Sequence, residues 1–251
     1  MPRFGPAGNP QAFYDTGFKS SVQMPAWLAA QKLSAYEYQC GRGVNIGAEQ
    51  SRLIGAAAAE HDIQMSIHAP YYINLASKDP DKQAKTIGYI LDSLRAAKSM
   101  GARRVVLHPG SAAQAASREE ALYLAGILLE QAIAAADQEN LLQNCALCPE
   151  VMGKINQLGN LDEVLALCRL DDRLIPCVDF GHLNARTHGG LRSAGNYLEA
   201  CKVIQNELGL DRLRSMHVHF SRIEFTAGGE KQHLQPASGS CHYLRIRWHA
   251  G

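Results

Sequence analysis

The chain has 251 residues, of which 46% are apolar and 20% are charged. This composition excludes a disordered chain and allows a sizeable core, and the length suits one (β/α)8 barrel. Because 25 Lys and Arg residues balance 24 Asp and Glu residues, the formal net charge is only +1. Any contact with nucleic acid must therefore depend on a local patch of positive charge.

Short strand-like runs alternate with longer helix-like stretches along the chain, which is typical of a parallel α/β protein. A short strand is predicted near Arg3 and Phe4, and six more at about 35–40, 63–68, 103–108, 143–149, 174–180 and 213–219. Helices are predicted at about 23–32, 47–61, 79–100, 117–139, 161–169 and 193–208. Ser117, followed by Glu120 three residues later, fits a capping box at one helix start. Since no linker interrupts this rhythm, we interpret residues 1–251 as a single domain.

The last stretch, 235–251, is an atypical tail. It contains Pro236 and two glycines but no Glu or Asp, and no helix is predicted after it. A barrel closes with eight strands, because an open parallel sheet leaves its edge groups unpaired. The sequence therefore predicts an α/β fold, a (β/α)8 TIM barrel that is incomplete at its C-terminus, with the eighth βα unit missing or aberrant. We expect a monomer, with self-association through the exposed barrel surface as the alternative.

Signals for targeting and disulfides are weak. Met1 to Gly5 lack the apolar region of a signal peptide, and no run reaches the ~18 apolar residues that a membrane span needs. Seven scattered cysteines do not suggest a disulfide framework, and the one CxxC pair, Cys145 and Cys148, lacks the second pair of a zinc knuckle. We expect a cytoplasmic protein with reduced thiols and no membrane contact.

Side chains that can bind a metal recur at the ends of successive predicted strands. The strand ends of a barrel meet at one face, so these residues can share one pocket. Imidazole mixed with carboxylate favours Zn²⁺, or else Mn²⁺, over Ca²⁺ and Mg²⁺. Two such ions about 3.5–4 Å apart provide what hydrolysis of a phosphodiester requires. The residues are His68, His108, Glu150, Asp179 and His217.

More candidate ligands lie further along the chain. His182 follows Asp179 by three residues, and Glu230 and His233 fall in the loop after the last predicted strand, where a plain solvated turn is the alternative. His219 shares a strand face with His217, so we expect either a supporting neighbour of a metal ligand or a packed residue.

Five stretches of the chain, in order and spacing, resemble endonuclease IV, the family-2 apurinic/apyrimidinic endonucleases with a xylose-isomerase-like TIM barrel. The resemblance spans about 2–235 and implies a zinc-dependent hydrolase of base excision DNA repair. Such an enzyme hydrolyses the phosphodiester 5′ to an abasic site in double-stranded DNA. The stretches are HAPYYINLAS (68–77), LHPGS (107–111), PE with GK and NLDEV downstream (149–164), VDFGHLNAR (178–186) and HVHFSRIEFTAGGEKQH (217–233).

The resemblance also implies two or three metal ions and assigns their ligands. His68, His108 and Glu150 would bind the first ion, and Glu150 would bridge it to a second ion held by Asp179 and His217, which makes Glu150 the catalytic residue. A third ion would be held by His182, Glu230 and His233, although the family has Asp-x-His where this chain has the last two residues.

For DNA binding, the resemblance implies that Tyr71 and Tyr72 insert into the base stack at the lesion. Arg42 and Arg222 are candidates for phosphate contacts. The alternatives are a tyrosine pair packed on the barrel rim and ordinary surface charge. Family members also carry a Glu on an eighth strand, which 235–251 does not provide, so the tail counts against activity.

Two other functions stay open. Sugar isomerases and epimerases of the xylose-isomerase type share the barrel and a Glu/Asp/His metal site, although the paired His68 and His108 argue against them. A metal-binding barrel remnant without turnover is the non-enzymatic alternative.

Overall fold

Parallel strands follow one another in chain order in the computed structural model, which describes residues 2–234. The first four form one sheet: β1 (Ala35–Gln39), β2 (Gln64–His68), β3 (Arg104–Leu107) and β4 (Ala146–Pro149). The next two, β5 (Cys177–Asp179) and β6 (His217–His219), pair with each other. A parallel bridge from Glu150 to Cys177 joins β4 to β5, so the six strands form one incomplete ring, and among residues 2–234 no strand pairing joins β6 back to β1.

The N-terminal segment extends this ring on the other side of β1. The backbone N–H groups of Ser34 and Ala35 donate to the carbonyl of Phe4, at 2.8 and 3.0 Å, and Gly8 N–H donates to the Glu37 carbonyl at 2.9 Å. The short strand predicted near Arg3 and Phe4 thus corresponds to an extended segment that runs parallel to β1.

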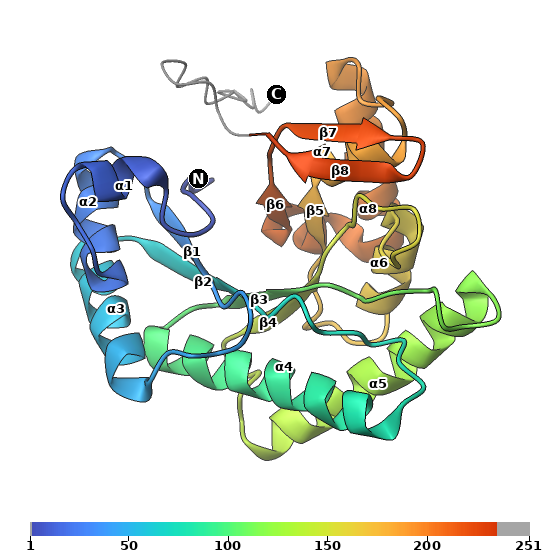
Figure 1. Ribbon diagram of the computed structural model, residues 1–251, viewed down its shortest axis with the longest axis horizontal. Helices are drawn as coiled ribbons and strands as arrows, with labels where there is room; N and C mark the ends of the chain where they lie inside the picture. The colour runs from blue at the N-terminus through green and yellow to red at the C-terminus, as the bar shows by residue number, and fades with distance from the viewer. Residues whose placement is uncertain (1, 235–251) are drawn as a thin grey trace.

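Helices surround the strands, and Figure 1 shows α3, α4 and α5 outside the four-stranded sheet. Asp79 accepts from the N–H groups at the start of α4, and Ser117 accepts from Glu120 N–H at the start of α5. The capping box predicted there is only half formed, because the Glu120 carboxylate accepts from the N–H of Ala116 instead of that of Ser117. The helices are α1 (Gln11–Asp15), η1 (Ser21–Gln23), α2 (Met24–Ala30), α3 (Ala48–Glu60), α4 (Pro80–Met100), α5 (Arg118–Gln138), α6 (Leu161–Cys168), α7 (Phe180–Arg186) and α8 (Ala194–Ser215).

The C-terminal third differs from the predicted elements. Residues 213–215, predicted as strand, belong to α8, which breaks at Gly209 (φ 84°) and then resumes. The loop predicted after the last strand is an antiparallel hairpin of β7 (Ile223–Thr226) and β8 (Gly229–His233), above β5 and β6 in Figure 1. The predicted atypical tail lies outside the described residues. Among residues 2–234, no eighth parallel strand follows β6.

The interior is apolar, with one large buried cluster whose members run from Phe13 to Leu208. Six cysteines in the described part of the chain are buried and unpaired. None of the helices described is both long and apolar enough to cross a membrane.

Candidate metal centre

Glu150 lies at the C-terminal end of β4 with only 1% of its surface exposed, and three imidazole rings converge on it. Its Oε2 atom is 3.2 Å from the Nε2 atoms of both His68 and His108. Its Oε1 atom is 2.8 Å from Nδ1 of His219. These residues come from the C-terminal ends of β2, β3, β4 and β6, which is the end of a barrel where active sites are built.

The ring of His68 is held in the orientation of a metal ligand. Its Nδ1 atom lies 2.8 Å from the carbonyl oxygen of Ala69, so Nδ1–H donates there. The lone pair of Nε2 therefore faces the carboxylate of Glu150, an arrangement that needs a cation or a proton between the two. A backbone carbonyl that orients the second ring nitrogen in this way is typical of histidines bound to metals.

The local electrostatics keep Glu150 ionised. Burial raises the pKa of this carboxyl, but the charge of His219 and hydrogen bonds from His108, His219 and His68, whose rings donate to it when protonated, outweigh burial and hold the pKa well below its usual range. Burial likewise lowers the pKa of His68, but the hydrogen bond and charge of Glu150 prevail and raise it. The site therefore stabilises positive charge beside a buried carboxylate, which suits a divalent metal.

A second group shares Glu150. Donor atoms of Glu150, Asp179 and His219 all lie within 4.8 Å of one another. Asp179 is the last residue of β5 and is buried, and its Oδ1 atom accepts from His182 N–H at 2.9 Å, which caps α7. The capping bond fixes this carboxylate at the strand end.

The histidine of this second group differs from the predicted one. The sequence predicted His217, but the structure places His219 beside Glu150 and Asp179. In the parallel pairing of β5 with β6, His219 lies level with Asp179, whereas His217 lies level with Cys177, about 6–7 Å further back along the strand. His217 instead contacts Glu37, with 2.9 Å between its Nε2 atom and Oε2 of Glu37.

A third group contains His182, Glu230 and His233. The Nε2 atoms of the two histidines lie 3.3 Å apart, and Nε2 of His182 is 3.4 Å from Oε2 of Glu230. Nδ1 of His182 donates to the carbonyl of Val151 at 2.9 Å, so its Nε2 carries a lone pair. Nδ1 of His233 lies 3.1 Å from the Ser221 hydroxyl. Two ring nitrogens that face each other beside a carboxylate fit a cation between them.

Glu230 reaches this group because the hairpin, predicted as a loop, is anchored to the loop after β4. Glu230 N–H donates to the carbonyl of Gly153 at 3.0 Å, and Ile155 N–H donates to the carbonyl of Gly228 at 3.1 Å. Only 12% of the Glu230 side chain is exposed. The residue is therefore not part of a solvated turn.

The four predicted DNA-contacting residues lie at the surface. Tyr71 and Tyr72 follow His68 and are 46% and 53% exposed, with their ring centroids 4.9 Å apart. Nε of Arg42 donates to the hydroxyl of Tyr71 at 3.1 Å, which joins these two elements. Arg222 lies just before β7.

Sequence reasoning missed Glu37. It is the middle residue of β1, 5% exposed, and accepts from the imidazoles of both His217 and His219. The available signal was a single carboxylate flanked by tyrosines in the strand predicted at 35–40.

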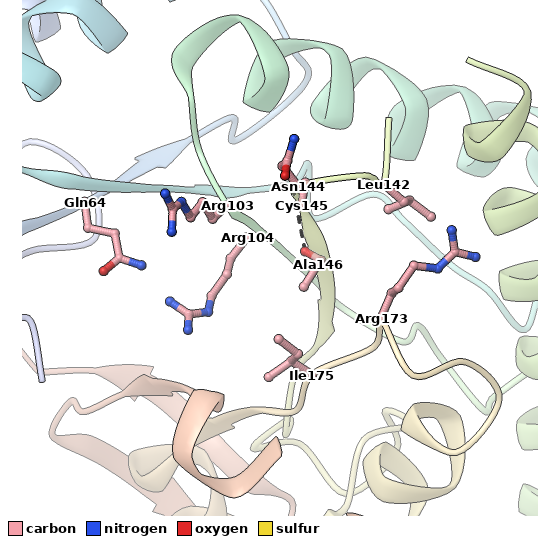
Figure 2. A pocket seen from close by; sticks show the side chains of 9 residues that line it. All are labelled: Gln64, Arg103, Arg104, Leu142, Asn144, Cys145, Ala146, Arg173 and Ile175. Atoms are coloured by element: carbon pink, nitrogen blue, oxygen red, sulfur yellow. Dashed lines mark hydrogen bonds between the residues drawn. The ribbon is translucent and has the colours of Figure 1, made fainter. Parts of the chain in front are cut away.

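A hollow of about 330 Å³ lies at the opposite end of the strands, and Figure 2 shows the side chains that line it. Gln64, Arg104 and Ala146, the first residues of β2, β3 and β4, contribute to it. In barrels of this kind the N-terminal face of the strands serves stability, so we do not assign this hollow to the metal centre. Its lining is completed by Arg103, Leu142, Asn144, Cys145, Arg173 and Ile175.

Parallel strands with histidines and carboxylates at successive C-terminal ends are typical of TIM barrels, whose active sites lie at that face. Residues 23–249 match the family described as xylose isomerase-like TIM barrel. The chain belongs to this family, which confirms the predicted fold class.

The chain is also similar in sequence to individual relatives from other organisms. The uncharacterized protein MJ0133 of Methanocaldococcus jannaschii is 30% identical over 243 residues, which cover 97% of this chain and 85% of that protein. The probable endonuclease 4 of Mycoplasma pneumoniae is 31% identical over 163 residues, which cover 63% of this chain. The match spans only about half of that relative, 53% of its length.

Two solved structures share the fold. Endonuclease IV from Thermus thermophilus superimposes with a TM-score of 0.60 at 21% identity, covering 84% of this chain and 74% of that one. A D-psicose 3-epimerase from Clostridium cellulolyticum superimposes with a TM-score of 0.61 at 14% identity, covering 84% and 83%. The predicted resemblance to endonuclease IV is thereby confirmed at the level of the family.

Proposed function

We propose that this chain is a zinc-dependent phosphodiester hydrolase that cleaves double-stranded DNA on the 5′ side of abasic sites. The observation that carries the proposal is the convergence on one barrel end of three groups of metal ligands that adjoin one another through Glu150 and His182. Nδ1 of His182 lies 3.4 Å from Asp179 and 3.6 Å from Glu150, so the third group directly adjoins the other two.

The ligand chemistry supports zinc. Imidazole and carboxylate make up all three groups, and Mn²⁺ is the second choice for such a set. His68, His108 and Glu150 would hold one ion, Glu150 with Asp179 and His219 a second, and His182 with Glu230 and His233 a third. When bound there, two or three divalent ions supply an acidified water and charge stabilisation for a leaving oxygen.

The chain's own residues prepare this chemistry. Glu150 stays ionised in a buried position, with Oε2 facing His68 and Oε1 facing His219, and a carboxylate with both oxygens engaged suits a bridging role. The capping bond holds Asp179, and the carbonyls of Ala69 and Val151 orient the rings of His68 and His182. Folding already fixes the positions of these groups, so they need little rearrangement when substrate binds.

The exposed tyrosines support DNA as the substrate. Tyr71 and Tyr72 lie in the loop after β2, which directly follows His68 of the first group of ligands, and both are about half exposed. Aromatic rings can stack in the space left by a missing base, and Arg42, bonded to Tyr71, can contact a neighbouring phosphate. Arg222 is a second candidate for such a contact.

The test is incision of a duplex oligonucleotide that carries one tetrahydrofuran abasic analogue. We expect incision 5′ to the analogue that is lost on chelation and restored by Zn²⁺. Glu150→Gln should lower the rate by about 10³-fold or more, because it removes the bridging charge.

Tyr72→Ala should weaken binding to the abasic duplex by about 10-fold or more, because a stacking ring is lost. The control is Tyr123→Ala on α5, an exposed tyrosine whose removal should not weaken binding.

Sugar epimerase activity is the competing function, and the fold shared with D-psicose 3-epimerase is its support. Turnover of a ketohexose without incision of abasic DNA would replace our proposal. Bound zinc without either activity would leave a metal-binding barrel.

A further inference from the structure

Glu37 is a buried carboxylate outside the three groups of ligands. It is 5% exposed and lies at the centre of β1, where it pairs with Ser66 of β2. Its side chain points into the barrel, because it contacts His217 and His219 of β6. Among residues 2–234, β1 has no backbone pairing with β6. The contact therefore crosses the interior of the ring.

The carboxylate of Glu37 is saturated with donors. Nε2 of His217 lies 2.9 Å from Oε2, and Nε2 of His219 lies 3.0 Å from Oε1. Gln39 donates to Oε1 at 3.0 Å, and Ser66 donates to Oε2 at 3.4 Å. Four donors directed at one buried carboxylate favour its ionised form. Burial raises the pKa of Glu37, but the neighbouring imidazoles outweigh it and hold the pKa well below its usual range.

The ring of His219 links this carboxylate to the metal centre. Its Nδ1 atom faces Oε1 of Glu150 at 2.8 Å, on the side of the group that includes Asp179, while its Nε2 atom faces Glu37. Histidines that bind metals usually donate the second ring N–H to a carboxylate or carbonyl, which fixes the tautomer and makes the ligating nitrogen more basic. His68 and His182 use backbone carbonyls for this purpose, and His219 has Glu37.

We propose that Glu37 is a positioning residue of the metal centre: it accepts the Nε2–H of His219, so that the Nδ1 lone pair is directed at the group formed by Glu150 and Asp179. The same carboxylate also contacts His217, two residues before His219 in β6. This second contact helps to fix the position of β6. This inference rests on the proposed metal centre but does not depend on the substrate.

Cys177 offers a competing arrangement. Its Sγ atom lies 3.8 Å from Nδ1 of His219, and Cys177, His217 and His219 could together hold an ion. Co²⁺ distinguishes the two, because a bound thiolate adds a sulfur-to-cobalt charge-transfer band that imidazole and carboxylate ligands do not.

The experiment measures metal binding by the full chain. Zn²⁺ affinity is determined by competition with a chromophoric chelator, stoichiometry by elemental analysis, and ligand geometry by the visible spectrum of the Co²⁺-loaded protein. Glu37→Gln keeps the side-chain volume but removes the charge. Glu163→Gln is the matched control, because Glu163 is also buried, 7% exposed, but is paired with Arg118 instead of an imidazole.

We expect Glu37→Gln to weaken the affinity of one Zn²⁺ ion by about 10–100-fold, with an unchanged total number of ions at saturation and an altered Co²⁺ spectrum. Glu163→Gln should lower stability without changing metal affinity. If Glu37→Gln does not fold, Glu37→Asp is measured instead, since it keeps the charge but withdraws the carboxylate from His219, and the expected direction is the same.

The inference would be overturned by unchanged Zn²⁺ affinity in the variant, by loss of one whole ion at saturation, which would make Glu37 a ligand, or by a thiolate band in the wild-type Co²⁺ protein. Absence of metal binding by the wild type would overturn it as well. Zinc binding that depends on Glu37 without incision of abasic DNA would defeat the proposed function alone. Incision with unchanged affinity in Glu37→Gln would defeat this inference alone.

Discussion

Glu37, Glu150 and Glu163 are all buried carboxylates that stay ionised, but their partners differ. Imidazoles surround the first two, so a metal or protons must balance their charge. Glu163 instead pairs with the guanidinium of Arg118 at 2.7 Å and accepts from the N–H groups of Gly159 and Asn160. An Arg partner is permanently charged, so this carboxylate serves the structure of the loop before α6 and not the metal centre.

The pH dependence of stability should reveal the role of Glu163. Burial raises its pKa, but the bonds from Arg118, Asn160 and Gly159 outweigh this and lower it from 4.5. A lowered pKa contributes stability that is present above the unfolded value and is lost as pH falls through the folded value. We expect Glu163→Gln to cost about 2 kcal/mol of unfolding free energy at pH 7, discounted for the partly exposed Arg118.

Urea unfolding at several pH values measures this difference. The gap between wild type and Glu163→Gln should shrink as pH falls below about 4.5. A gap that stays constant down to the acid limit would contradict the assignment.

At the scale of elements, the loops after β2 and β3 support each other and thereby place His68 and His108. Oδ1 of Asn74 accepts from Ser111 N–H at 3.0 Å, and Leu75 N–H donates to the carbonyl of Pro109 at 3.1 Å. The two loops lie so close together that position 110 requires a glycine. Its φ is +115°, and a Cβ there would lie 2.2 Å from Oδ1 of Asn74.

We therefore expect Gly110→Ala to lower the free energy of unfolding by about 3 kcal/mol, because it combines backbone strain with a clash. It should also weaken zinc binding, since both ligand-bearing loops must shift. The control is Gly88→Ala, because Gly88 lies inside α4 and a Cβ there would meet nothing within 4 Å. This control should raise stability by up to about 1 kcal/mol. Equal effects of the two substitutions in urea unfolding would refute the argument.

For the whole molecule, the candidate metal centre brings together distant parts of the chain. Its candidate ligands come from β2, the loops after β3 and β4, β5, α7, β6 and the β7–β8 hairpin. A ligand that binds only the folded state stabilises it by mass action. Bound ions therefore oppose separation of the strands that carry their ligands.

Removal of metal should lower the thermal stability of the whole chain. At a free Zn²⁺ concentration of about 100 times the dissociation constant, one site contributes about 2.7 kcal/mol, which corresponds to roughly 5–10 °C in Tm for a chain of this size. Differential scanning calorimetry with Zn²⁺ and with a chelator measures the shift. Identical Tm values in the two conditions would show that no such site forms.

The sequence by itself determined the alternation of strands and helices and the positions of β1 to β5 to within a few residues. The convergence of these side chains was predictable too, because strand ends in a parallel barrel meet at one face wherever the strands lie in the chain. His68, His108, Glu150 and Asp179 lie together in the structure as that rule requires.

Only the tertiary structure decided which histidine of β6 stands beside Asp179. Period-two alternation puts His217 and His219 on one face of the strand, and the choice between them depends on the register with β5, which is a non-local contact. The contact of Glu37 with both histidines and the pairing that carries Glu230 to His182 are non-local as well. Local patterns of hydrophobicity carry no information on such distances, because these are set by how remote elements pack.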